Sequence, residues 1–202
     1  MTFAESNGAR MHPTANVDFK RSSSSAQQVP RALLKNLRAD LLADLEARLS
    51  RGESLDDQVL PMLHQALAAE RLIDASLGFI VADMAGPMTL GFVKGFPPDV
   101  VKRCLTLDFG QAVCGTVAST RKAMHVTDIQ RSLDPLAELV RAAGINAYAC
   151  EPLIVGDELV GTLSFASRSR RRFDPEDLAF FRQIARHVAQ ARCRMRQADH
   201  AS

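Results

Sequence analysis

The sequence predicts an α+β domain in which one antiparallel sheet is flanked along the chain by helices. Two segments with helical leucine spacing come first, at 31–50 and 54–74, and a long helical segment follows Asp174. Between them lie apolar, β-branched runs separated by turns that contain glycine or proline. Strands grouped between helices are typical of α+β folds, and the lack of strand–helix alternation excludes a Rossmann-like fold.

The N-terminal part of the chain divides into a polar segment and two helices. Residues 1–29 contain a run of four serines and no periodicity, so we expect them to be disordered. The helix of residues 30–52 begins at Pro30 and carries a leucine every three or four residues until Gly52 ends it. Ser54 and Asp57 then form the capping box of a second helix, within a main domain at 53–196. We expect a disordered tail at 197–202.

The middle of the chain reads as short strands with helical insertions. The expected elements are a hairpin of strands at Leu77–Met84 and Met88–Lys94, a helical turn at Pro98–Arg103, a short strand at Cys104–Phe109, a short helix in QAVCGTVAST, a strand at Ala123–Ile129 and a helix at Pro135–Ala143.

A second hairpin, at 147–167, is expected near the centre of the sheet. Its two arms flank Gly156 and Asp157, which suit a tight turn. Both arms are too apolar for a sheet with one face in water, so helices or a cavity should cover both sides. Gly161 lies inside the second arm, where glycine marks a bulge or a close approach by another segment. The last helix begins at Pro175, after Asp174 as its cap.

Composition excludes several classes of protein. The chain has 202 residues, a net charge of +2 and no apolar run near the roughly 20 residues that cross a bilayer. Its first residues do not resemble an export signal, so we expect a cytoplasmic protein with reduced thiols. The four cysteines form no CxxC pair, so their spacing does not support a structural zinc site, and the sequence leaves the cofactor unknown.

Four stretches in order resemble the GAF domain family, particularly bacterial sensory modules found upstream of histidine kinases and cyclic-di-GMP enzymes. They are GFPPDVV, FGQAVCGTVAST, HVTDIQ and the segment from GINAYACEPL to DPEDLAFF, and the resemblance covers about 54–194. It implies a GAF-like, PAS-related antiparallel sheet with N- and C-terminal helices on one face. A ligand pocket on the other face would be roofed by residues 109–148. No kinase, cyclase or DNA-binding segment follows the last helix, so we expect the signal to pass to another polypeptide.

The candidate pocket contains residues whose chemistry is open to two interpretations. Cys114 lies in the first helical turn after Gly110, where a thiolate or small anion is favoured, but buried cysteine is also an ordinary small apolar residue. Tyr148, the only tyrosine, either supplies a polar group to the pocket or closes the core. The full candidate set is Phe109, Val113, Cys114, His125, Asn146, Tyr148 and Cys150. A metal site at His125 and the cysteines lacks ligand spacing.

Three functions follow from this resemblance. The first is a cytoplasmic sensor of an unidentified small molecule, which forms a parallel homodimer through its first and last helices and reports to a histidine kinase or response regulator of a two-component system. The second is a thiol-dependent reductase that uses Cys114 with Cys150, like free methionine-(R)-sulfoxide reductases, although the loop that carries their attacking cysteine has none here. The third is a dimerising partner-binding domain without a ligand. No aromatic residues are interleaved with the arginines at 168–172, and acidic residues lie close by in the sequence. Nucleic acid and membrane partners are therefore not expected.

Overall fold

The computed structural model describes residues 31–200, and the predictions for 1–29 and for the last two residues lie outside this range. Its centre is a six-stranded antiparallel sheet with the order β3-β2-β1-β6-β5-β4. The strands are β1 (Ala75–Ile80), β2 (Met88–Lys94), β3 (Thr106–Leu107), β4 (Met124–Val126), β5 (Ala147–Val155) and β6 (Glu158–Ser167). The predicted α+β class and the antiparallel sheet are confirmed.

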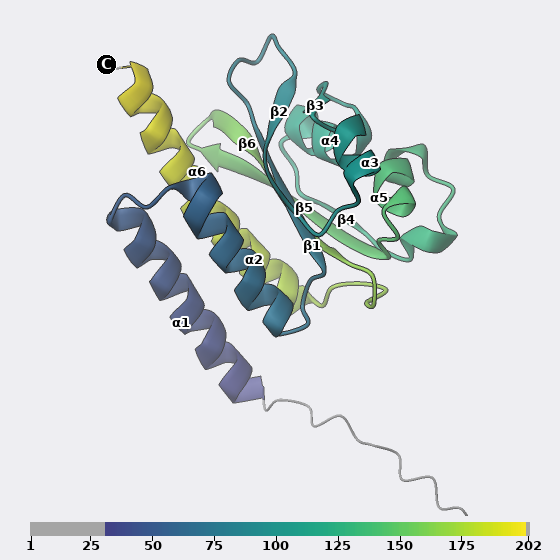
Figure 1. Cartoon of the computed structure of the whole chain (residues 1–202), viewed down its shortest axis with the longest axis horizontal. Coiled ribbons are helices and arrows are strands. Elements are labelled where there is room, and N and C mark those ends of the chain that lie inside the picture. The colour runs from purple at the N-terminus through teal and green to yellow at the C-terminus, as the bar shows by residue number, and fades with distance from the viewer. Residues whose placement is uncertain (1–30, 201–202) are drawn as a thin grey trace, which may run out of the picture.

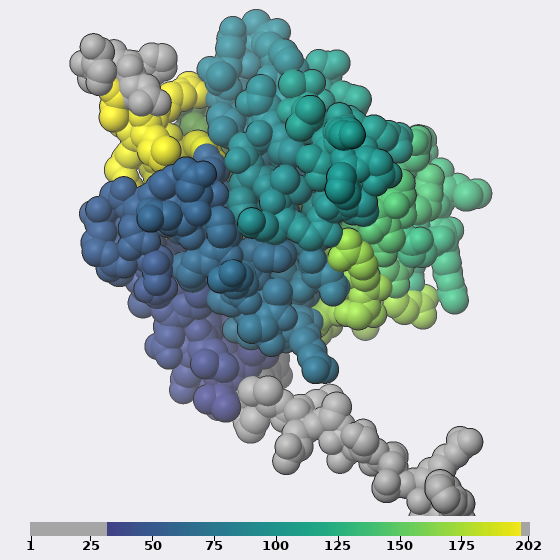
Figure 2. All heavy atoms as spheres, in the orientation of Figure 1, coloured from purple at the N-terminus to yellow at the C-terminus, as the bar shows by residue number. Residues whose placement is uncertain are grey.

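Helices cover both faces of the sheet, in two groups (Figure 1). On one face lie α1 (Arg31–Ser50), α2 (Leu60–Ala69) and α6 (Pro175–His200). On the other lie the short helices α3 (Pro98–Arg103), α4 (Ala112–Thr120) and α5 (Glu138–Ala142). Figure 2 shows the two groups on opposite sides of the molecule, with the N-terminal helices in purple and blue. The N- and C-terminal helices therefore pack together on one face, as expected.

The hairpin of β5 and β6 is buried on both faces. Every residue of β6 after Glu158 is buried, and alternate side chains enter two separate apolar cores. Leu163 and Phe165 face α2 and α6, whereas Leu159 and Ala166 face the short helices. A side chain at Gly161 would overlap the carbonyl oxygen of Phe79 on β1, so this glycine permits the close strand approach that its position predicted.

The helix α1 forms an outer layer on α2 and α6 and lies apart from the sheet (Figure 1). Leu45 is fully buried against the helical core, and Leu41, Leu42 and Leu49 pack against it. Toward the start of α1, Leu33 and Leu37 are 49% and 44% exposed. The C-terminal leucines of α1 thus pack inside the domain, whereas the N-terminal ones face solvent.

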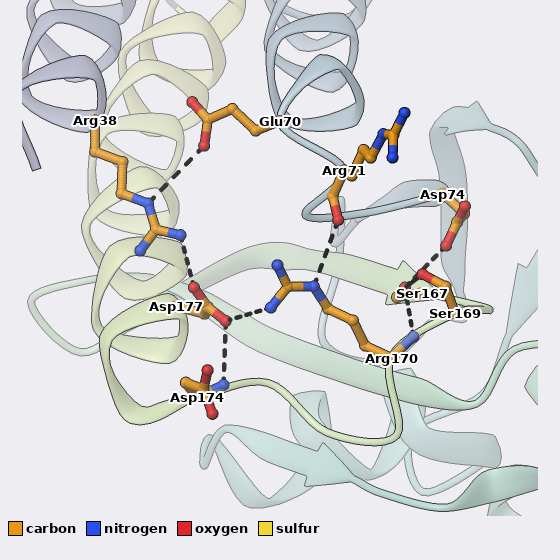
Figure 3. A network of polar contacts seen from close by, with 9 residues as sticks. All are labelled: Arg38, Glu70, Arg71, Asp74, Ser167, Ser169, Arg170, Asp174 and Asp177. Atoms are coloured by element: carbon orange, nitrogen blue, oxygen red, sulfur yellow. Dashed lines mark hydrogen bonds and ion pairs between the residues drawn. The ribbon is translucent and has the colours of Figure 1, made fainter. Parts of the chain in front are cut away.

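A polar network fixes α1 to the domain (Figure 3). Arg38 Nη2 donates to Asp177 Oδ1 at 2.6 Å, and Asp177 Oδ2 accepts from Arg170 at 3.2 Å and from the Asp174 N–H at 3.1 Å. Arg170 also donates to the carbonyl of Arg71. The network joins α1, the end of α2, the β6–α6 loop and the first turn of α6.

Several predicted boundaries are wrong. The second helix begins with a π-helical turn at Leu55–Val59 and ends at Ala69 because Arg71 has a φ of 54°, so it stops before the predicted residue 74. The strand predicted at 77–84 is shifted to 75–80, and the one at 123–129 shortens to three residues followed by a 3₁₀ turn. The helix α6 continues to His200, so residues 197–200 of the predicted disordered tail are helical.

The arginine-rich β6–α6 loop makes its contacts inside the chain. Arg168 donates to the carbonyl of Gly95 at 2.6 Å, and Arg171 pairs with Asp128. Together with the contacts of Arg170, these bonds hold the loop against the start of the sheet. They give three of the four arginines in this run a role in the fold.

Candidate functional site

The face of the sheet opposite α6 is closed by α3, α4 and α5, and a small cavity remains beneath them. Its walls come from β1, the α3 region, α4, α5 and β5, and include Leu77, Phe79, Cys104, Cys114, Val140 and Tyr148. Its free volume is about 20 Å³, room for one water-sized molecule. Side chains therefore fill most of the space where the sequence predicts a ligand.

A buried cluster of thiols and hydroxyls forms the floor of this cavity. Cys114 Sγ on α4 lies 3.1 Å from the Tyr148 hydroxyl on β5 and 3.4 Å from Ser164 Oγ on β6. Cys150 stands directly opposite Ser164 in the β5–β6 ladder, on the same face. Cys114 and Tyr148 are 4% and 1% exposed, and Cys150 is fully buried. The helix and the sheet thus bring two free thiols and two hydroxyls together away from bulk solvent.

The cluster shifts the pKa values of its two thiols, Cys114 and Cys150, in opposite directions. The thiol of Cys150 and the hydroxyls of Ser164, Tyr148 and Thr162 lower the pKa of Cys114, although burial opposes this shift. Burial raises the pKa of Cys150 well above its usual range, and its hydrogen bond to Cys114 adds to the increase. Burial likewise raises the pKa of Tyr148. Cys114 is therefore the member of the cluster best suited to carry a negative charge.

One hydroxyl of the same surface lacks a regular hydrogen bond. Thr162 on β6 pairs with Phe79 on β1 and with Pro152 on β5, which places its side chain on the cavity face. Thr162 is fully buried, and its Oγ1 makes no hydrogen bond of regular geometry among residues 31–200, although it lies near enough to Cys114 to help lower the pKa of that thiol. Because a buried polar group without a partner costs free energy, this hydroxyl marks a place where a further polar atom would stabilise the fold.

The position of Cys114 depends on the glycine that follows it. A side chain at Gly115 would overlap the carbonyl oxygen of Asp108, so only glycine lets α4 lie against the preceding loop. The Gly110 N–H donates to the carbonyl of Gly115 at 2.8 Å across this contact. The VCG segment therefore turns Val113 and Cys114 toward the sheet.

The structure brings together only part of the predicted candidate set. Val113, Cys114 and Tyr148 line the cavity, and Cys150 belongs to the buried cluster below it. Phe109 is half-buried at the margin of the same core. Of the seven candidates, Phe109, Cys150, His125 and Asn146 are not part of the cavity lining itself.

Strand register explains why His125 is elsewhere. It pairs with Ala149, whose side chain enters the helical core, and its Nε2 lies 3.2 Å from Glu151 Oε1 on the face covered by α6. Asn146 uses its backbone to bond Ser167 and Ile129. Sequence reasoning missed Thr162 and Ser164, although period-two alternation along β6 places both on one face.

Other kinds of site find no support in the described range. Between residues 31 and 200, no three His, Cys, Asp or Glu side chains are grouped so that they could hold a metal ion. Within the same range, no helix combines the length and apolarity needed to span a bilayer.

Comparison with known proteins connects this fold and site to one family. Residues 57–192, more than half of the chain, match the GAF domain profile. Protein YtsP of Bacillus subtilis (strain 168) is 25% identical over 155 residues, which cover 73% of this chain and 90% of YtsP.

Solved structures share the fold. The GAF domain of a phosphoenolpyruvate-protein phosphotransferase from Coxiella burnetii has a TM-score of 0.66 at 22% identity, covering 83% of this chain and 98% of its own. Free methionine-R-sulfoxide reductase from Neisseria meningitidis, in complex with its substrate, has a TM-score of 0.64 at 19% identity, covering 81% and 92%. At these identities the structures support the fold alone. The profile match extends over both the sheet and the cavity-forming helices, and the chain therefore belongs to the GAF domain family.

Proposed function

We propose that this chain is a cytoplasmic sensor that binds a small molecule between the sheet and the helices α3–α5. The observation that carries the proposal is the buried hydroxyl of Thr162, which makes no hydrogen bond of regular geometry, beside the cluster of Cys114, Tyr148 and Ser164. Ligand pockets combine apolar walls with a few convergent polar groups, and this surface has that composition. Since the free volume is small, a ligand larger than a water molecule would displace the covering helices.

Such a displacement gives the ligand a means of shifting the population of two states. The strands β5 and β6 carry the cavity floor on one face and contact α6 on the other. A change of packing in the cavity would therefore reach α6 across the thickness of one sheet.

We propose that the surface formed by α1 and α6 transmits the signal to a partner protein. A groove of about 700 Å³ runs between these helices, with Leu34, Leu42 and Phe180 among its lining residues. Exposed apolar surface of this kind favours association. We propose a parallel homodimer through this surface, and a histidine kinase or response regulator as the protein that receives the signal.

A thermal-shift screen and native mass spectrometry test the sensor. Nitrate, haem, nucleotides and small organic acids are the probes, and a binder should raise the melting temperature of the wild type. The variant Val140→Phe, which fills the cavity, should abolish that shift, whereas the exposed change Leu133→Phe should retain it. A monomeric protein stabilised by none of the probes would contradict the proposal.

A second candidate function, a thiol-dependent reductase, is supported by the position of Cys150 beside Ser164, a hydrogen-bond partner of Cys114, and by its effect in lowering the pKa of Cys114. The Cys114 thiolate would attack the sulfur of a small sulfoxide and take its oxygen, which releases the sulfide and leaves a sulfenic acid. The Cys150 thiol would then condense with that sulfenic acid to form a disulfide and water, and an added dithiol would regenerate both thiols.

Turnover of free methionine sulfoxide with dithiothreitol distinguishes the two functions. Activity that disappears in both Cys114→Ser and Cys150→Ser, and persists in Cys193→Ser, would support the reductase and overturn the sensor. No turnover in the wild type would overturn the reductase.

A further inference from the structure

A second concave surface lies at the edge of the sheet, where residues 151–155 of β5 extend past β4 and approach α6. Its volume is about 380 Å³, separate from the cavity beneath α4. Lys122 comes from the α4–β4 loop, Glu151 from β5, and Arg182 and Arg186 from successive turns of α6. The groove thus joins the sheet to the helix through which the proposed signal would leave.

The floor of the groove is a buried carboxylate with an incomplete set of partners. Glu151 is only 2% exposed because it faces α6 in the ladder, as does its cross-strand partner Leu163. Its Oε1 lies 3.2 Å from His125 Nε2. Its Oε2 has no hydrogen bond within residues 31–200, and the nearest cation, Arg182 Nε, is 4.0 Å away. A buried carboxylate commonly accepts several hydrogen bonds, so Oε2 is an acceptor available to a ligand.

The rim of the groove carries the opposite charge. Lys122 and Arg186 are exposed, stand on different elements and make no ion pair or hydrogen bond within the described part of the chain. Arg182, which is 53% exposed, adds a third cation. Apolar surface from Pro152, Ile154 and Ala185 lies between floor and rim. An acidic group at the rim would meet at least two cations without a competing carboxylate of the rim itself.

We propose that this groove binds a free α-amino acid. The ammonium group donates to Glu151 Oε2, the carboxylate lies between Lys122 and Arg186, and the side chain rests on Pro152 and Ile154. Each charged group of the groove then has a partner of opposite sign, which a simple anion or an amine alone would not provide. The bound molecule bridges β5 and α6 and so acts on the same helix as the cavity ligand, from a different site.

The test is a thermal-shift panel of the standard amino acids at millimolar concentration, with isothermal titration calorimetry of those that stabilise the wild type. At least one should bind, and its N-acetyl and carboxamide derivatives should each bind at least about tenfold more weakly, because each lacks one charge. Glu151→Gln and Arg186→Gln should each weaken binding by a similar factor.

The control variant is Arg194→Gln, which removes an exposed charge from the same helix outside the groove and should leave affinity unchanged. No stabilisation by any amino acid overturns the proposal, as does equal binding of the N-acetyl derivative, which would indicate a simple anion site. If Glu151→Gln does not fold, the two derivatives test the same contacts on the wild type. Val140→Phe, which fills the other cavity, should retain amino-acid binding in the groove. The sensor proposal and the amino-acid proposal can therefore fail independently of each other.

Discussion

Arg38 on α1 and Asp177 on α6 form a nearly buried ion pair that fixes the outermost helix of this domain. Arg38 Nη2 lies 2.6 Å from Asp177 Oδ1, and the two side chains are 11% and 7% exposed. The guanidinium also lies over the ring of Phe180, 5.0 Å from its centroid. Since α1 makes no substantial contact with the sheet, this pair and a few leucines hold the helix in place.

Loss of the Arg38 guanidinium should loosen α1 while the sheet stays intact. Arg38→Gln leaves Asp177 with Arg170 and the Asp174 N–H, so we expect a loss of about 1–3 kcal/mol in the free energy of unfolding. Urea denaturation measures that loss, and hydrogen exchange should show faster labelling in α1 than in β5 and β6.

The matched control for this ion pair is Arg51→Gln. Arg51 is 56% exposed and pairs with Glu53, so its loss should cost less than about 1 kcal/mol. Equal destabilisation by the two variants would contradict a special role for the buried pair.

The fold was predictable because its central elements carry strong local signals. The β5–β6 hairpin has apolar arms on both sides of Gly156, and the boundaries of β2 and α3 follow proline and glycine directly. The end of the second helix was not predictable, since Arg71 adopts a left-handed conformation that its side chain does not favour. The turn at Arg71 places the next two residues, Leu72 and Ile73, in the core, and their burial overrides local preference there.

The site was predictable in part, for a related reason. Cys114 and Tyr148 were identified by residue type, and the fold places them 3.1 Å apart although 34 positions separate them in sequence. His125 lies on the face covered by α6 and not in the predicted pocket, because a strand of three residues is too short for its alternation to be recognised in the sequence. Only the pairing with Ala149 determines its side.

The hydroxyl of Tyr148 should control the acidity of Cys114. Tyr148→Phe removes the group 3.1 Å from Sγ, which helps to lower the pKa of that thiol, so the pKa should rise in the variant. We expect ultraviolet thiolate absorbance to appear at higher pH than in the wild type, with Cys114→Ser as the baseline for subtraction. Stability should fall by about 1 kcal/mol. An unchanged titration would show that the Tyr148 hydroxyl does not contribute to the acidity of Cys114.

Gly161→Ala should be among the most damaging single changes in the sheet. The added methyl group would overlap the carbonyl oxygen of Phe79, a backbone atom that can move only with β1. We expect a loss of roughly 3 kcal/mol or failure to fold. Gly86→Ala is the control, because nothing lies within 4 Å of the new Cβ and its stability should change by less than about 0.5 kcal/mol. Similar melting temperatures for both variants would contradict this account.

His64 should make stability depend on pH in the mildly acidic range. Its Nδ1 lies 2.8 Å from Ser76 Oγ, and burial, followed by the nearby charge of Lys94, lowers the pKa of the imidazole. The folded protein therefore resists protonation, whereas the unfolded chain takes up a proton near its ordinary pKa of about 6.5. Stability from this residue is present above that pH and is lost as the pH falls below it.

The variant His64→Gln keeps a polar side chain beside Ser76 but cannot titrate. Urea midpoints at about pH 7.5 and about pH 5.5 should therefore fall further for the wild type than for the variant. Comparing the two changes removes the contributions of the other histidines, which both proteins share. If the wild type and His64→Gln lose the same stability on acidification, burial of His64 does not couple folding to protonation. The 2.8 Å contact with Ser76 would then be a hydrogen bond that either charge state of the ring can make.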